Sequence, residues 1–196
     1  HNTLVGAQGF GDTVAGIKNA VAAGLIVSIN TPLCSLNRDF ADTLRFAASL
    51  GVRYATCSGL IPSGAATTGD SLATRLSESE LEDILRTAVE TAQSMNMELD
   101  FTSPGWLPEE KLRALGLQLI PSCGACLSNM AITPDGTVVP CCLDHEGDIP
   151  LGNLFQEDLG AILDSPRAKA IYDGFSKNQA SEPLCRRCGY AERFRK

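Results

Sequence analysis

The chain has 196 residues, of which 44% are hydrophobic and 20% charged, so a folded core is expected and wholesale disorder is not. The formal net charge of −7 disfavours nucleic acid and anionic membrane surfaces as partners. No apolar run reaches the roughly 18 residues that a membrane span needs, and no signal peptide is visible, so we expect a cytoplasmic protein without a membrane partner.

The first 120 residues repeat one pattern, in which a helix with an apolar stripe is followed at once by a β-rich run. The first stripe is Phe10, Val14, Ile17 and Val21, and a later helix begins at the capping box Ser77-Glu78-Ser79-Glu80. Each helix ends at a residue that readily adopts left-handed backbone: Gly24, Gly51, Asn96 and Gly116. The predicted strands are residues 25–30, 52–57, 97–101 and 117–120.

This alternation predicts an α/β fold with a parallel sheet and helices packed outside it. Four such units form either half of an eight-unit barrel or one open sheet. In both arrangements the loops that follow the strands hold the ligands, and here those loops are residues 31–38, 58–77 and 102–107.

Six of the eight cysteines lie after residue 120. Two CxxC pairs, Cys123/Cys126 and Cys185/Cys188, flank the adjacent pair Cys141-Cys142. Short apolar runs around Pro134-Asp135-Gly136 predict a β-hairpin that brings the first CxxC beside Cys141-Cys142. Eight cysteines in an acidic chain without a secretion signal favour metal or redox use over disulfides, so we expect a four-cysteine metal site. The spacing leaves zinc and an iron–sulfur cluster equally open.

The segments around these cysteines are predicted from local signals. Residues 154–163 and 167–175 form two short helices that cover the site. Residues 144–148 are acidic but lack the ordered spacing of a calcium-binding EF-hand, so we expect an ordinary loop there.

The region from Cys123 to Cys188 resembles the SPASM/twitch domains that follow the barrel of many radical S-adenosylmethionine (SAM) enzymes. Cys126, Gly136 and Cys141 have the spacing of that family's first motif, residues 151–154 read Leu-Gly-Asn-Leu, and Cys185/Cys188 form its closing CxxC. More loosely, residues 1–121 look like the C-terminal half of a radical SAM-type (β/α) barrel. The resemblance therefore implies a half barrel over residues 1–121 and a SPASM/twitch domain, with a hairpin and short helices, over residues 122–196.

The same resemblance implies one auxiliary [4Fe-4S] cluster, because Phe194 stands where a full SPASM domain has its next cysteine. It implies the following ligands: Cys123 (slightly favoured) or Cys126, with Cys141, Cys185 and Cys188. It also implies that Asn30, at a strand's C-terminal end, and the loop from Gly59 to Gly64 contact SAM.

The resemblance further implies a function for a longer parent protein. The radical-generating motif CxxxCxxC is absent, so we expect this chain to be the C-terminal portion of that enzyme and inactive alone. The parent would be an oxidoreductase or maturase that abstracts hydrogen from a peptide, protein or small-molecule substrate. Its electron donor would be a flavodoxin or ferredoxin. The alternatives are a zinc-stapled α/β binding module and a single-cluster electron-transfer protein.

Overall fold

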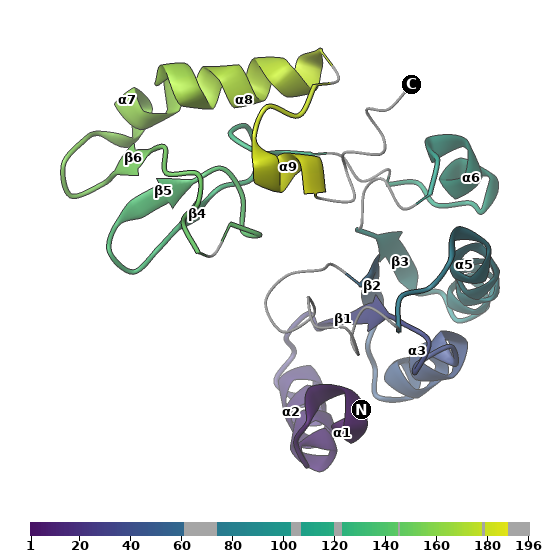
Figure 1. Ribbon diagram of the computed structural model, residues 1–196. Helices are drawn as coiled ribbons and strands as arrows, with labels where there is room; N and C mark the ends of the chain where they lie inside the picture. The colour runs from purple at the N-terminus through teal and green to yellow at the C-terminus, as the bar shows by residue number, and fades with distance from the viewer. Residues whose placement is uncertain (61–73, 103–106, 120–122, 145, 178, 188–196) are drawn as a thin grey trace. The chain divides into compact units, whose positions relative to one another are not determined.

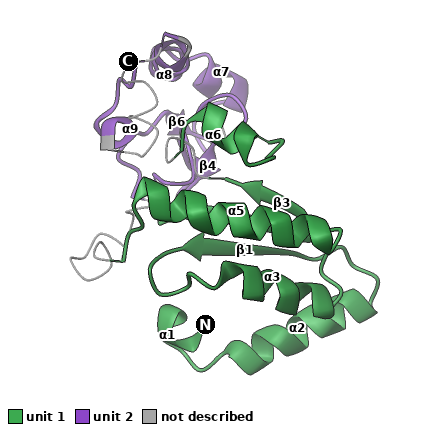
Figure 2. Ribbon diagram, turned by 90° about the vertical axis from the view of Figure 1, so that its right-hand side faces the viewer, with its two compact units in different colours: residues 1–103, 107–121 green, residues 104–106, 122–196 purple. Residues whose placement is uncertain are grey.

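The computed structural model describes residues 1–60, 74–102, 107–119, 123–144, 146–177 and 179–187. The chain divides into two compact units, shown separately coloured in Figure 2. Unit 1 contains the described residues up to 119, and unit 2 contains those from 123 onward. Within the described ranges, every helix is too short or too polar to cross a membrane.

Unit 1 alternates helices and strands, as its sequence predicts (Figure 1). Its elements are α1 (Asn2–Val5), α2 (Phe10–Ala22), β1 (Ser28–Leu33), α3 (Phe40–Ser49), β2 (Tyr54–Gly59), α5 (Glu78–Ser94), β3 (Glu98–Phe101) and α6 (Glu109–Ala114). The three strands lie side by side in the order β1-β2-β3, and both pairings are parallel. The predicted parallel α/β architecture is confirmed, in the form of a three-stranded sheet.

The two faces of this sheet differ. Figures 1 and 2 show α3 and α5 against one face, where Leu44, Leu85 and Phe101 are fully buried. Side chains that alternate with the buried ones point to the opposite face, where Asn30 and Tyr54 are exposed, Thr56 and Asp100 are half-buried and Ser58 is buried. The described helices therefore cover the apolar face and leave a polar face of a parallel sheet uncovered.

All four predicted helix stops are confirmed. Gly24, Gly51 and Gly116 have φ angles of 77°, 89° and 86°, and Asn96 has a φ of 53°. In each case this residue and the next one donate backbone hydrogen bonds to the last turn, as Gly24 does to Val21 and Leu25 to Ala20. This is the Schellman arrangement, which ends a helix by satisfying its last carbonyl groups.

The same caps explain where two strand predictions are wrong. β1 begins at Ser28 rather than Leu25, because the Leu25 amide is used to close α2. Leu25 and Ile26 are therefore outside the sheet and are 63% and 84% exposed. The fourth predicted strand is absent from its described part, residues 117–119, where the Leu117 amide likewise caps α6.

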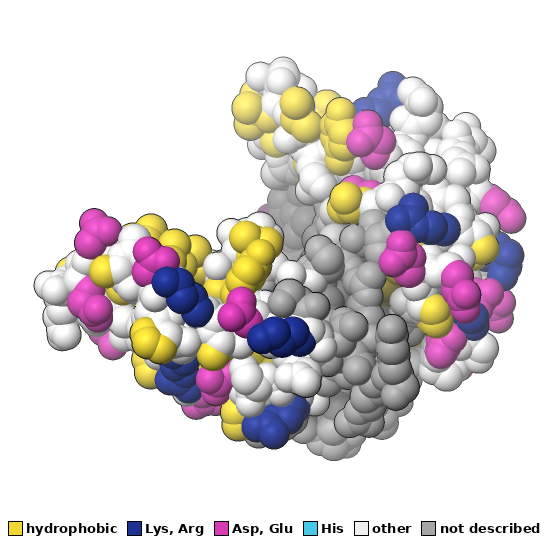
Figure 3. Space-filling view, turned by 90° about the horizontal axis from the view of Figure 1, so that it is seen from above, with side chains coloured by type: hydrophobic (Ala, Val, Ile, Leu, Met, Phe, Trp, Pro, Cys, Tyr) yellow, Lys and Arg dark blue, Asp and Glu magenta, His cyan; other side chains and the backbone are white. Residues whose placement is uncertain are grey.

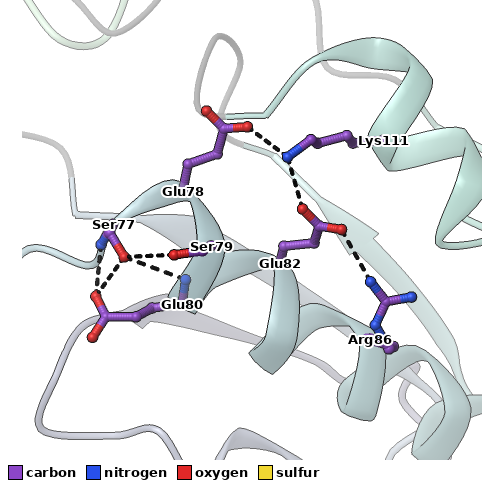
Figure 4. A network of polar contacts seen from close by, with 7 residues as sticks. All are labelled: Ser77, Glu78, Ser79, Glu80, Glu82, Arg86 and Lys111. Carbon is purple, nitrogen blue, oxygen red and sulfur yellow. Dashed lines mark hydrogen bonds and ion pairs between the residues drawn. The ribbon is translucent and has the colours of Figure 1, made fainter.

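The predicted capping box is also confirmed. The Ser77 hydroxyl accepts the Glu80 amide, and the Glu80 carboxylate accepts the Ser77 amide at 2.8 Å (Figure 4). On the same first turns of α5, Glu78 and Glu82 each accept a hydrogen bond from Lys111 of α6 at 2.8 Å. These contacts fix the start of α5 and connect it to α6.

Replacing Ser77 with alanine should lower the free energy of unfolding of unit 1 by about 1 kcal/mol, because a helix amide loses its acceptor. Thr87→Ala, at an exposed position of the same helix, is the matched control and should change stability by less than about 0.5 kcal/mol. Urea denaturation followed by circular dichroism measures both. An equal effect of the two substitutions would contradict the cap.

The stabilising effect of this box should also depend on pH. Hydrogen bonds from Arg38 and Ser77 lower the pKa of Glu80 from 4.5 to about 2. A carboxyl group whose pKa is depressed on folding stabilises the folded state above its ordinary pKa, and this is lost as the pH falls toward the lowered value. Glu80→Gln should therefore destabilise the protein at pH 7 and have a much smaller effect near pH 2. An equal effect at both pH values would exclude the charge as the cause.

Unit 2 contains a small antiparallel sheet and three short helices (Figure 1). Its elements are β4 (Ala131–Ile132), β5 (Thr137–Val139), β6 (Gly152–Asn153), α7 (Leu159–Leu163), α8 (Pro166–Ser176) and α9 (Pro183–Arg187). The strand order is β4-β5-β6. α8 matches its prediction closely and α7 occupies only the second half of its predicted range, whereas α9 was not predicted. Figure 3 shows one face of the chain with both units, and on it acidic, basic and hydrophobic side chains are intermixed.

Candidate metal centre

A tight hairpin organises the centre of unit 2. β4 and β5 pair antiparallel, with Ala131 opposite Val139. Gly136 has the positive φ, 84°, that the turn between them requires, and a Cβ atom there would lie 2.7 Å from the Phe155 ring. The predicted hairpin is confirmed, and its turn is closed on one side by an aromatic ring.

The first CxxC lies on a compact turn beside this hairpin. The Gly124 carbonyl accepts the amides of the three residues 127–129 at 2.8–2.9 Å. Cys126 has a φ of 61°, which is uncommon for a residue other than glycine. Its amide donates to the carbonyl of Pro140, the residue before Cys141, at 3.2 Å. The predicted approach of the first CxxC to the Cys141-Cys142 end is therefore confirmed by a direct hydrogen bond.

Four cysteines pack against one apolar cluster. The cluster consists of seven buried side chains: Ala125, Val138, Ile149, Leu151, Ile162, Ala168 and Ile171. Cys123, Cys126, Cys141 and Cys185 are half-buried against it. Cys142, by contrast, is exposed. Segments that are distant in the sequence thus bring four of the five predicted ligands to one core.

The thiols of the first CxxC and Cys141 influence one another electrostatically. Burial, together with the negative charges that Cys123 and Cys141 would carry as thiolates, raises the pKa of Cys126 to about 11. A cation at this place would reverse that effect, because bound metal ions favour the thiolate form. This group of thiols is therefore suited to a positively charged iron or zinc centre.

Within the described part of the chain, no three Cys, His, Asp or Glu side chains converge closely enough to coordinate one metal ion. Cys188, one of the predicted ligands, lies outside the described residues. The ligand set Cys123 or Cys126, Cys141, Cys185 and Cys188 therefore stays a prediction. The donors are nonetheless all thiols, which is the donor set of zinc and of iron–sulfur clusters.

A comparison with known protein families bears on the choice between zinc and an iron–sulfur cluster that the cysteine spacing leaves open. Residues 120–189 match the SPASM family, described as an iron–sulfur cluster-binding domain. The match covers about a third of the chain and includes all the predicted ligands. No curated protein and no solved structure matches the chain. The SPASM match supports an iron–sulfur cluster as the cofactor of unit 2.

The residues predicted to contact SAM lie in unit 1. Asn30 is in the middle of β1, not at its C-terminal end as predicted, because the strand extends to Leu33. Its side-chain oxygen accepts the Thr56 hydroxyl of β2 at 2.9 Å. Gly59 is the last residue of β2, and Gly64 lies outside the described residues. A SAM-binding role for these residues is a prediction.

Sequence reasoning missed three charged residues of unit 2. Asp144, predicted in an ordinary acidic loop, is 2% exposed, and its carboxylate accepts the amides of Asp148 and Ile149, both at 2.9 Å. Arg167 and Glu182 form an ion pair between segments 15 residues apart. The apolar Ile149-Pro150-Leu151 after the acidic stretch was a signal for Asp144. Nothing local indicates the Arg167–Glu182 pair.

Proposed function

We propose that this chain is the C-terminal portion of a radical SAM enzyme and binds one auxiliary [4Fe-4S] cluster. The observation that carries the proposal is the SPASM match over residues 120–189, in which four half-buried cysteines pack against one core. We assign the ligands as Cys123 or Cys126 together with Cys141, Cys185 and Cys188. The cluster would supply one-electron chemistry or anchor the substrate.

The residues of unit 2 would prepare this site in two ways. The apolar cluster limits the access of water to one side of the thiols, which affects the reduction potential of a bound cluster. The hydrogen bond from Cys126 to Pro140 holds the first CxxC beside Cys141. Deprotonation of the thiols accompanies metal binding, so cluster assembly should release protons.

The sheet face that the described helices of unit 1 leave open supports a barrel-type parent. Parallel sheets usually have both faces covered, and in a (β/α) barrel the second face is the interior. Here the row Asn30, Thr56 and Asp100, aligned across the three strands, is polar, and Asn30 is exposed. We infer that this face lines the reaction chamber of the parent, where a peptide, protein or small-molecule substrate loses a hydrogen atom.

The full-length parent protein tests this proposal. The 196 residues contain no CxxxCxxC motif, so the proposal places that motif elsewhere in the parent. Reduced anaerobic parent protein with SAM should produce 5′-deoxyadenosine, measured by chromatography and mass spectrometry. A parent that contains the auxiliary cluster but neither CxxxCxxC nor this product would instead be an electron-transfer protein.

A further inference from the structure

Two separate segments of unit 2 carry the ligands assigned to the later half of the site. Cys141 begins the loop that runs to Pro150, and Cys185 lies on the short helix α9. One short strand, β6, and two helices, α7 and α8, separate these segments in the sequence, so tertiary contacts must set the distance between them. α9 has only five residues and cannot position its cysteine by its own stability.

One guanidinium group bridges the two segments. Arg167, in the first turn of α8, donates through Nε and Nη2 to the two carboxylate oxygens of Glu182, both at 3.1 Å. Its remaining nitrogen, Nη1, donates to the Pro150 carbonyl at 3.1 Å. Glu182 directly precedes α9, and Pro150 ends the loop that follows Cys141. Arg167 therefore binds both cysteine-bearing segments at once.

Both ends of this bridge are anchored. The Glu182 carbonyl accepts the Arg186 amide at 3.0 Å and so begins the first turn of α9. Pro150 stands between the buried side chains of Ile149 and Leu151, and the buried carboxylate of Asp144 holds the Ile149 amide. A displacement of Arg167 would thus be transmitted to the backbone on either side of the ligands.

The geometry distinguishes this contact from an ordinary surface ion pair. Exposed ion pairs contribute little, since solvent screens them and two long side chains lose freedom. The Arg167 and Glu182 side chains are 41% and 18% exposed, and the paired arrangement of two parallel hydrogen bonds fixes direction as well as distance. By contrast, the Lys169–Asp164 pair of the same region is 59% and 78% exposed and consists of a single contact.

We propose that Arg167 and Glu182 are positioning residues for the iron–sulfur cluster, which hold the Cys185 segment at a fixed distance from the Cys141 loop. This inference rests on the proposed function. Neither residue needs to touch the cluster; each acts through the ligand-bearing backbone. Groups that hydrogen-bond metal ligands directly change metal affinity by about 10- to 100-fold when they are replaced; since Arg167 and Glu182 act through the backbone, we expect the lower end of that range.

The test uses anaerobically reconstituted protein with the substitutions Arg167→Gln, Glu182→Gln and Arg167→Lys. The rate of iron release to a chelator is measured for each, together with the electron paramagnetic resonance spectrum of the reduced cluster. Both glutamine variants should lose iron on the order of 10-fold faster than the unsubstituted protein, with a shifted spectrum. Arg167→Lys keeps the charge but not the paired hydrogen bonds. Its rate of iron release should lie between that of the unsubstituted protein and those of the glutamine variants.

Lys169→Gln is the matched control and should change the rate by less than about twofold, because its ion pair is exposed. Thermal unfolding of the apoproteins separates positioning from folding, and Glu182→Gln retains the test if Arg167→Gln does not fold. Unchanged release rates and spectra in folded glutamine variants would overturn the positioning role while leaving cluster binding intact. Absence of iron and sulfide from the unsubstituted protein would overturn the proposed function instead, and the positioning role with it.

Discussion

Replacing Cys141 with alanine should remove the iron–sulfur cluster, lowering bound iron from about four atoms per chain to less than about one. Cys141 is half-buried on the apolar cluster and lies beside the first CxxC through the hydrogen bond from Cys126 to Pro140. A cluster with one missing thiolate loses both a bond and a negative charge that balances the iron. Iron and acid-labile sulfide analysis after anaerobic reconstitution measures the effect.

The neighbouring Cys142 provides a control of the same chemistry at the next position. Its side chain is exposed and is not among those that pack against the apolar cluster. Cys142→Ala should therefore keep the full iron and sulfide content and the brown absorbance. If Cys142→Ala loses the cluster and Cys141→Ala keeps it, the assignment of ligands within this pair is wrong.

Replacing Gly136 with alanine should destabilise unit 2 by about 2 kcal/mol. About 1–2 kcal/mol comes from placing a Cβ atom on left-handed backbone, since Gly136 has a φ of 84°. A smaller cost comes from the neighbouring side chains, because that Cβ atom would lie 2.7 Å from the Phe155 ring and 3.0 Å from the Asn153 side-chain oxygen, and the Phe155 side chain, which is 80% exposed, must rotate away.

Native-state amide hydrogen exchange measures this loss within unit 2. The amides of Leu151 and Leu154 donate to hairpin carbonyls of Val138 and Gly136, at 2.8 and 2.9 Å. A loss of about 2 kcal/mol accelerates their exchange on the order of 10-fold or more when opening limits it. Gly147→Ala is the control, because Gly147 has a φ of 77° and nothing within 4 Å of its missing Cβ atom. If the two substitutions have equal effects, contact with Phe155 is not a cause.

Much of the fold was predictable because its signals are local. The capping box at Ser77, the four helix stops and the turn at Pro134-Asp135-Gly136 each depend on a few adjacent residues, and all appear in the structure. The start of β1 was not predictable from the apolar run at Leu25. A Schellman cap uses the residue after the glycine, and this competes with the tendency of Leu25 and Ile26 to form a strand.

The candidate site likewise has one part that local sequence signals predicted and one part that they did not. The spacing of the cysteines and the hairpin between them predicted that the first CxxC lies near Cys141, as the structure shows. The burial of Asp144 had a local signal in the apolar residues that follow the acidic stretch. The bridge from Arg167 to Glu182 and Pro150 joins segments that are distant in the sequence. No periodicity or spacing encodes that contact, so Arg167 and Glu182 could be found only in three dimensions.

The central claim is that the cysteines of unit 2 hold an iron–sulfur cluster. The most direct test is the content of iron, acid-labile sulfide and zinc in protein purified without oxygen. About four iron and four sulfide per chain, with a broad brown absorbance, are expected for one [4Fe-4S] cluster. One zinc ion per chain without sulfide would contradict the account and indicate a structural zinc site with the same thiolate donors.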